Sequence, residues 1–197
     1  MMDTRFELID RCTTFNELLH DMELLLNKEH LFYGHGTGNA MDESMAILMY
    51  LSESNDVLDE EQLKTSISDQ VQEKAKEVLY QRVTESKPLP YITNEAYFCG
   101  KKFYVDERVL IPRSPIAELI NNRFEPWLNP NSINRVLEIG TGSGCIALSI
   151  AEALSDIEVV ATDISPDAID VARLNTKAHD LEQQVEIIES DLFENVS

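Results

Sequence analysis

The first part of the chain carries apolar side chains three or four positions apart, which is the spacing of one helix face. Three such stripes occur, at Phe15–Leu26, Met41–Leu51 and Gln70–Glu85. Thr14 followed by Glu17 matches the capping box that begins many helices. The pattern predicts a helical domain over residues 1–86, with four or five helices whose apolar faces form its core.

The pattern changes at Lys87-Pro88-Leu89-Pro90, which we take as the domain boundary. Short alternating runs at Tyr97–Phe98 and Lys102–Val105 predict a β-hairpin. Pro115, with Ser114 as a cap, is placed to open a short helix. Residues 87–115 are therefore expected to form a linker that contains a hairpin.

From residue 116 onwards, apolar runs of strand length alternate with helical segments. The expected strands cover residues 136–140, 159–163 and 185–188, and a helix begins at Cys145. Strands that alternate with helices favour a parallel sheet. The expected fold class is α/β: a helical domain, a hairpin linker, and the first half of a Rossmann-like domain over residues 116–197.

Three glycines at alternate positions, Gly140, Gly142 and Gly144, join the first strand to its helix. They permit a positive φ and a close approach of the backbone to a ligand. A dinucleotide fingerprint needs a glycine three places after its second one, where this chain has Cys145. Glu138, just before the loop, would repel a pyrophosphate and attract a cation. S-adenosylmethionine, which has sulfonium and ammonium groups, therefore fits this loop better than NAD.

Acids also end the second and third strands. Asp163 is placed to accept both ribose hydroxyls, and Asp191 to lie beside the adenine amino group with Leu192 against the ring. Acids at the carboxyl ends of three parallel strands predict a cofactor crevice at that edge of the sheet. The candidate cofactor-binding residues are Glu138, Gly140, Thr141, Gly142, Ser143, Gly144, Asp163, Asp191 and Leu192.

Several stretches resemble the HemK-type methyltransferases, which modify the side-chain amide of glutamine in translation proteins. They are Lys87-Pro-Leu-Pro-Tyr-Ile, Phe98-Cys-Gly-Lys-Lys-Phe-Tyr-Val, Val109-Leu-Ile-Pro-Arg and the loop from Glu138 to Ala147. Release-factor enzymes continue Ile-Pro-Arg with Pro-Asp-Thr-Glu, whereas this chain has Ser114-Pro-Ile-Ala-Glu. That segment and Phe32-Tyr-Gly-His-Gly-Thr-Gly-Asn-Ala are similar to the branch that methylates large-subunit ribosomal protein three. The resemblance implies a class I methyltransferase domain with S-adenosylmethionine as cofactor.

Members of this family carry an Asn-Pro-Pro-Tyr motif after a fourth strand, and it occurs nowhere in this chain. The resemblance therefore leads us to expect an N-terminal fragment that lacks the last strands of the sheet and is inactive alone. We assign no catalytic residue. The strand at 136–140 would then have an exposed edge through which the chain associates with itself.

Three classes of function stay open at this point. The first is a glutamine methyltransferase acting on a ribosomal protein, with a release-factor enzyme as its near alternative. The second is an enzyme that methylates exocyclic amino groups of nucleic acid and shares the glycine loop. The third is a non-catalytic binding fragment whose helical domain recognises the ribosomal protein.

The formal net charge of −20 bears on this choice. Residues 1–86 hold 18 acidic and 7 basic residues, and the rest holds 18 and 9. Direct binding to nucleic acid normally needs basic patches, so we expect no nucleic-acid partner. A basic ribosomal protein, not yet covered by RNA, would be attracted to such a surface. Solubility alone is an equally plain reason for the charge.

Smaller features complete the prediction. We expect a cytoplasmic protein with no membrane partner, because the chain has neither a membrane-length apolar run nor a signal peptide. Its three scattered cysteines suggest reduced thiols, and no metal site is expected. The glycine-rich stretch from Gly34 to Gly38 is either a helix connector or a substrate-recognition loop in which His35 and Asn39 offer hydrogen bonds. Arg113 either orients substrate or forms a structural ion pair.

Overall fold

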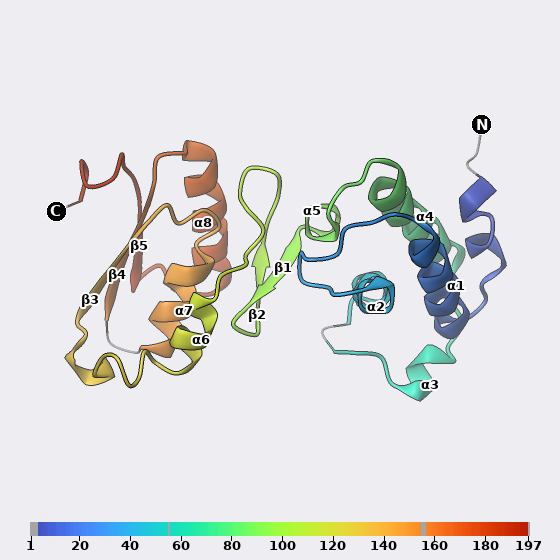
Figure 1. The fold of residues 1–197 in the computed structure, drawn as a ribbon, viewed down its shortest axis with the longest axis horizontal. Coiled ribbons are helices and arrows are strands. Elements are labelled where there is room, and N and C mark those ends of the chain that lie inside the picture. Colours follow the sequence, from blue (N-terminus) through green and yellow to red (C-terminus); the bar gives the residue numbers. More distant parts are fainter. Residues whose placement is uncertain (1–3, 55, 155–156, 197) are drawn as a thin grey trace. The chain divides into compact units, whose positions relative to one another are not determined.

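The structure is a computed structural model that describes residues 4–54, 56–154 and 157–196. It divides into two compact units, Met1–Thr93 and Asn94–Ser197 (Figure 1). The predicted helical domain ended at residue 86, whereas the first unit continues for one more short helix. Across these described ranges, none of the helices combines the length and the apolar character that crossing a bilayer requires.

The first unit is helical, and its described residues contain the five α-helices at the upper end of the prediction. They are α1 (Phe15–Lys28), α2 (Ala40–Ser52), α3 (Glu60–Leu63), α4 (Asp69–Thr84) and α5 (Leu89–Thr93), preceded by the 3-10 turns η1 (Thr4–Phe6) and η2 (Ile9–Arg11). The apolar stripes of α1, α2 and α4 meet in one core. Leu18, Ile47 and Leu79, one from each of these helices, are fully buried.

Helix starts in this unit follow the sequence signals with two differences. The Thr14 hydroxyl accepts from the Glu17 amide, as expected, but the Glu17 carboxylate reaches back to the amide of Thr13 rather than to that of Thr14. Asn39 is the N-cap of α2, and its side-chain oxygen accepts from the Asp42 amide at 2.9 Å. Its side-chain amide also bonds Asp42, so Asn39 serves the helix rather than an open hydrogen-bonding role.

The second unit begins with the predicted hairpin, which is confirmed. Strands β1 (Glu95–Phe98) and β2 (Lys101–Tyr104) pair in antiparallel register. Helix α6 (Ile116–Asn121) follows, with Pro115 at its N-cap position instead of its first helical position. The Ser114 hydroxyl accepts from the Ile116 amide, the first of the helix, at 3.4 Å, and Ser114 itself lies one residue before the N-cap position.

The rest of this unit is a parallel sheet with helices, which confirms the α/β prediction. After the 3-10 turn η3 (Pro130–Ser132) come β3 (Arg135–Ile139), α7 (Cys145–Ala153), β4 (Glu158–Asp163), α8 (Pro166–Ala178) and β5 (Val185–Glu189). The strand order is β3-β4-β5, so the chain crosses over twice in the same direction. Successive right-handed crossovers then place α7 and α8 on the same face of the sheet (Figure 1).

Strand β3 lies at an edge of this sheet. Because side chains alternate along a strand, Val136 faces the core beneath α7 while Leu137 and Ile139 face the other way. Leu137 is 39% exposed and Ile139 42%. The carboxyl ends of the three strands meet at one side of the sheet, where the candidate site is found.

Candidate functional site

The glycine loop between β3 and α7 has the backbone shape that its sequence predicted. Gly140, Gly142 and Gly144 have φ values of +77°, +55° and +82°. The amides of Gly140 and Thr141 both donate to the carbonyl of Thr162, which fixes the loop against β4. A Cβ built on Gly140 or Gly142 would meet no protein atom within 4 Å. The backbone at these two positions therefore faces open space that a ligand can fill.

Glu138, near the end of β3, accepts hydrogen bonds from the loop and from the first turn of α7. One oxygen of its carboxylate accepts from the Thr141 hydroxyl at 2.7 Å and from the Ala147 amide at 3.0 Å. Ala147 is the third residue of α7, whose N-cap, Gly144, has no side chain to satisfy that amide. Burial raises the pKa of Glu138 to about 7; the two hydrogen bonds oppose this effect, and the charge of Asp163 adds to it. Glu138 thus caps α7 and holds the loop.

Asp163 ends β4 directly beside the same loop. Its two carboxylate oxygens accept from the Gly142 amide at 2.9 Å and from the Ser165 amide at 3.0 Å. A carboxylate has about four acceptor positions, so both oxygens retain capacity for a ligand's hydroxyl groups. The sequence placed Asp163 at this edge, and the structure brings it to the glycine loop.

A cavity of about 360 Å³ lies over these groups. Its floor is the glycine loop with Asp163, and its far wall is the segment from Arg108 to Ser114. Ser165 and Ala168, at the start of α8, close one side. This concave space beyond the carboxyl ends of parallel strands is where open α/β sheets bind their ligands.

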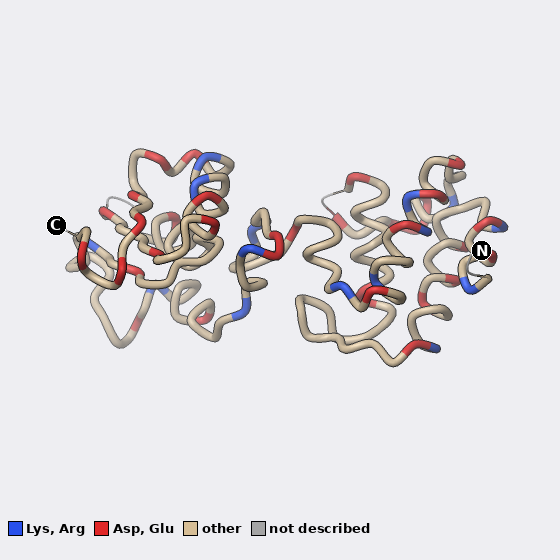
Figure 2. Tube along the Cα trace, turned by 90° about the horizontal axis from the view of Figure 1, so that it is seen from above, with Lys and Arg blue, Asp and Glu red and all other residues tan. Residues whose placement is uncertain are grey.

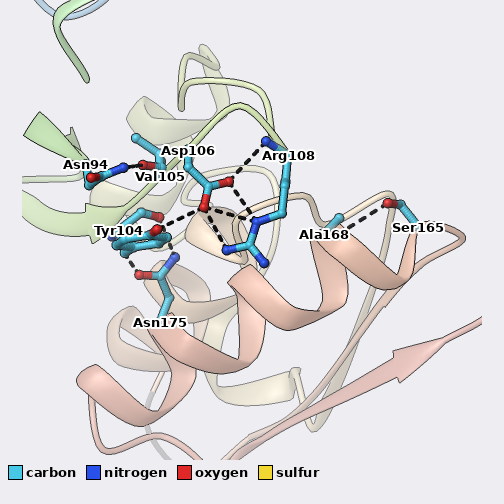
Figure 3. A network of polar contacts seen from close by, with 8 residues as sticks. All are labelled: Asn94, Tyr104, Val105, Asp106, Arg108, Ser165, Ala168 and Asn175. Carbon is cyan, nitrogen blue, oxygen red and sulfur yellow. Dashed lines mark hydrogen bonds and ion pairs between the residues drawn. The ribbon is translucent and has the colours of Figure 1, made fainter. Parts of the chain in front are cut away.

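The far wall is stiffened by an ion pair that the sequence analysis did not single out (Figure 3). The Arg108 side chain donates to both carboxylate oxygens of Asp106, and the Tyr104 hydroxyl donates to one of them at 2.9 Å. The Arg108 hydrogen bonds are the main reason that the pKa of Asp106 falls to about 2. The turn that leads from the hairpin into the cavity wall therefore has a fixed shape.

Asn175 on α8 is a second residue that sequence reasoning missed. Its side-chain oxygen accepts from the Tyr104 amide at 2.7 Å, and its side-chain nitrogen donates to the Tyr104 carbonyl (Figure 3). The same nitrogen donates to the Ser143 carbonyl at 2.8 Å. Asn175 is 1% exposed. One buried amide thus ties the hairpin to the glycine loop. An asparagine on the inward face of a helix was the available signal.

The remaining predicted cofactor residues divide between two places. Thr141 and Ser143 line the cavity with Gly140 and Gly142, whereas Gly144 and Glu138 are not among its lining residues. Asp191 and Leu192 do not line it either, because they line a separate hollow of about 410 Å³ with Phe193 and Glu194. Leu192 has a φ of +49° and is 58% exposed. The turn after β5 thus places both residues at this second hollow.

Arg113 and Cys145 lie next to the glycine loop, and their surroundings indicate what each can do. Arg113 lines the cavity and is exposed, and its side chain has no hydrogen bond or ion pair within the described part of the chain. Cys145 is 7% exposed at the first position of α7, where burial raises the pKa of its thiol to about 11. Cys145 thus packs as a protonated small residue. Arg113 is the cavity-lining cation without a partner among the described residues, since Arg108 pairs with Asp106.

The residues present fit S-adenosylmethionine. The open space against Gly140 and Gly142 admits a ligand to the backbone, Asp163 offers carboxylate oxygens, and Glu138 provides a second acid beneath the loop. These groups accept hydrogen bonds and attract positive charge, which suits a ribose and a sulfonium. They do not suit a pyrophosphate.

Comparisons with known proteins agree with this chemistry. Residues 123–197 match the family model described as methyltransferase small domain. Over 87% of its length the chain is 38% identical to a ribosomal protein uL3 glutamine methyltransferase of Francisella tularensis subsp. tularensis, and covers 55% of that protein. Over 93% it is 35% identical to the enzyme of the same description from Neisseria gonorrhoeae, covering 62%. The chain thus spans somewhat more than half the length of these relatives.

Among solved structures, the METTL16 methyltransferase domain superposes with a TM-score of 0.42 at 19% identity. The match covers 63% of this chain and 52% of that one. A superposition this partial carries no argument about function.

Proposed function

We propose that the protein methylates a glutamine side-chain amide in a large-subunit ribosomal protein. Its 38% and 35% identity to two ribosomal protein uL3 glutamine methyltransferases and its match to the methyltransferase small domain support this proposal. The observation that carries the proposal is the joint placement of the glycine loop and Asp163 on one cavity. The relatives' substrate, ribosomal protein uL3, is the acceptor we propose here.

S-adenosylmethionine, when bound, supplies a methyl group that its sulfonium makes electrophilic. Gly140 and Gly142 would receive it against their backbone, and Asp163 would accept hydrogen bonds from its ribose hydroxyls. The negative charge of Glu138 would attract the sulfonium and ammonium groups of the cofactor. Asp191 and Leu192, proposed from the sequence for the adenine, would need the turn after β5 to rearrange.

A glutamine amide is a poor nucleophile because its nitrogen shares its lone pair with the carbonyl group. Holding the amide in line with the methyl group is therefore most of the catalysis. Arg113 is placed to orient an acceptor, since it lines the cavity with an uncommitted guanidinium within the described residues. We name it as a substrate-orienting residue and assign no catalytic role to any other side chain.

The charge of the chain favours a basic protein as acceptor over nucleic acid. Figure 2 shows acidic residues along both units, and they outnumber the basic ones by 36 to 16. Such a surface attracts a basic ribosomal protein that is not yet covered by RNA, and it repels phosphate. We place the reaction in the cytoplasm, where ribosomal proteins are made.

The test measures transfer of labelled methyl groups by the complete protein to three acceptors under the same conditions. They are free uL3, a peptide-chain release factor and naked nucleic acid. We expect label in uL3. Label in nucleic acid would support the amino-group methyltransferase, and label only in the release factor would support the sister glutamine methyltransferase.

A further inference from the structure

The loop formed by residues 32–38 joins α1 to α2 in the first unit and has an unusual backbone. Gly34 has a φ of +148° and Gly36 a φ of +106°. A Cβ added to Gly34 would lie 3.0 Å from the ring of Phe32. The ring of Phe32 therefore lies over Gly34, and this arrangement requires a glycine at position 34.

A buried ion pair holds the 32–38 loop at both ends. Arg82 on α4 donates to Glu43 on α2, and both side chains are 4% exposed. A second nitrogen of Arg82 donates to the Phe32 carbonyl at 2.9 Å. The other oxygen of Glu43 accepts from the Thr37 hydroxyl at 3.0 Å.

A loop that only connects two helices does not need a buried ion pair to hold it. Buried ion pairs add little net stability over well-packed apolar residues, because desolvation offsets their attraction. What this pair adds is a defined position for the loop, since each partner directs a further hydrogen bond to it. The loop is therefore held in one shape before anything binds.

The fixed loop presents an aromatic side chain to solvent. Phe32 is 69% exposed, whereas the hydroxyl of its neighbour Tyr33 donates to the Leu26 carbonyl. The His35 ring meets Phe32 edge-on at 5.6 Å. His35 Nδ1 is shielded from water but has no hydrogen-bond partner within the described residues. Aromatic residues, phenylalanine among them, are enriched in protein–protein interfaces, and Phe32 offers an exposed ring on a fixed support.

We infer that the 32–38 loop is a docking site for a basic segment of the protein substrate, with Phe32 as its central contact. The partner chemistry follows from charge, because the first 86 residues hold 18 acids against 7 bases. An arginine of the substrate can lie over the Phe32 ring, and the net negative charge of the unit attracts the basic segment that carries it. This inference rests on the proposed function for its substrate, a basic ribosomal protein.

The test measures binding of the 197-residue chain to isolated uL3 by calorimetry at low salt. Phe32→Ala should weaken the affinity at least about tenfold, the loss expected for a central aromatic contact. Phe32→Trp, which keeps an aromatic face, should stay within about threefold of wild type. Val57→Ala is the matched control, because Val57 is 63% exposed in the same unit but lies outside the loop.

Gly34→Ala gives an independent variant that retains the Phe32 side chain but strains the backbone beneath it. It should also weaken binding, since the ring would lose its fixed position. Cofactor affinity, measured on the same samples, should be unchanged in all four variants.

If wild type binds uL3 and Phe32→Ala binds it with the same affinity, this inference is wrong and the proposed function is unaffected. No binding of uL3 by the wild-type chain would contradict both. A Phe32→Ala effect on binding to ribosomal RNA, and not to uL3, would identify the loop as a nucleic-acid contact and overturn it as well.

Discussion

The carboxylate of Glu138 accepts a hydrogen bond from the backbone amide of Ala147 at 3.0 Å. The two residues lie on either side of the glycine loop, so this bond closes the loop and caps α7 in place of Gly144. The sequence suggested Glu138 as an attractor for a cation. The structure adds that its charge is held in a buried position, where the pKa rises to about 7.

We therefore predict that the affinity of the 197-residue chain for S-adenosylmethionine rises between about pH 6 and about pH 8. Glu138 loses its proton in this range, and the resulting charge attracts the sulfonium and ammonium groups. The Glu138→Gln chain keeps the shape and an acceptor oxygen but no charge, so its affinity should stay flat. Calorimetry over the pH range checks this, with Glu189→Gln at the end of β5 as a charge-matched control.

The same shift predicts how stability changes with pH. A carboxyl group whose pKa is raised on folding contributes its full stability below its unfolded value near 4.5 and loses that contribution as the pH rises through about 7. Wild type should lose stability relative to Glu138→Gln over this interval. A difference in unfolding free energy that stays constant from about pH 4.5 to about pH 8 would show that burial does not shift this group.

Asp163→Ala should reduce cofactor affinity by about 10- to 100-fold. Hydrogen bonds to a charged group are worth about 1.5–3 kcal/mol, and the variant removes the acceptor for the ribose hydroxyls. Asp191→Ala is the informative comparison, because Asp191 lies outside the cavity and should change affinity by less than about threefold. Equal losses in the two variants would mean that the turn after β5 moves to the cofactor.

Asn175→Ala should lower the unfolding free energy of the chain by about 2–4 kcal/mol. The substitution leaves the Tyr104 amide and the carbonyls of Tyr104 and Ser143 without their buried partner. Urea unfolding measures the loss, and Asn131→Ala, at an exposed position in η3, should stay within about 0.5 kcal/mol. A stable Asn175→Ala chain would show that the hairpin and the glycine loop do not depend on this tie.

The exposed edge and face of β3 predict self-association of the 197-residue chain. Leu137 and Ile139 are partly exposed on a strand whose outer edge has no partner strand within the described residues. Light scattering should show a mass that grows with concentration, and Leu137→Lys should suppress this growth. A monomer at all concentrations would contradict the prediction.

The sequence predicted the site's backbone better than its side-chain network. Alternation of strand and helix placed Asp163 beside the glycine loop, because parallel strands bring their carboxyl ends together. It did not predict the turn after β5, which places Asp191 and Leu192 at a separate hollow and gives Leu192 a φ of +49°. The inward position of Asn175 could be read from the helix pattern, but its partner could not, because Tyr104 lies 71 residues earlier in the chain.

We propose that this protein methylates a glutamine amide in free ribosomal protein uL3. Tandem mass spectrometry of uL3, after incubation of the isolated protein or the assembled large subunit with the complete enzyme and S-adenosylmethionine, tests it most directly. We expect one methyl group on a glutamine side chain of isolated uL3, with far less on the assembled subunit, whose RNA an acidic enzyme avoids. Methylation of another residue type, or equal methylation of both substrates, would contradict it.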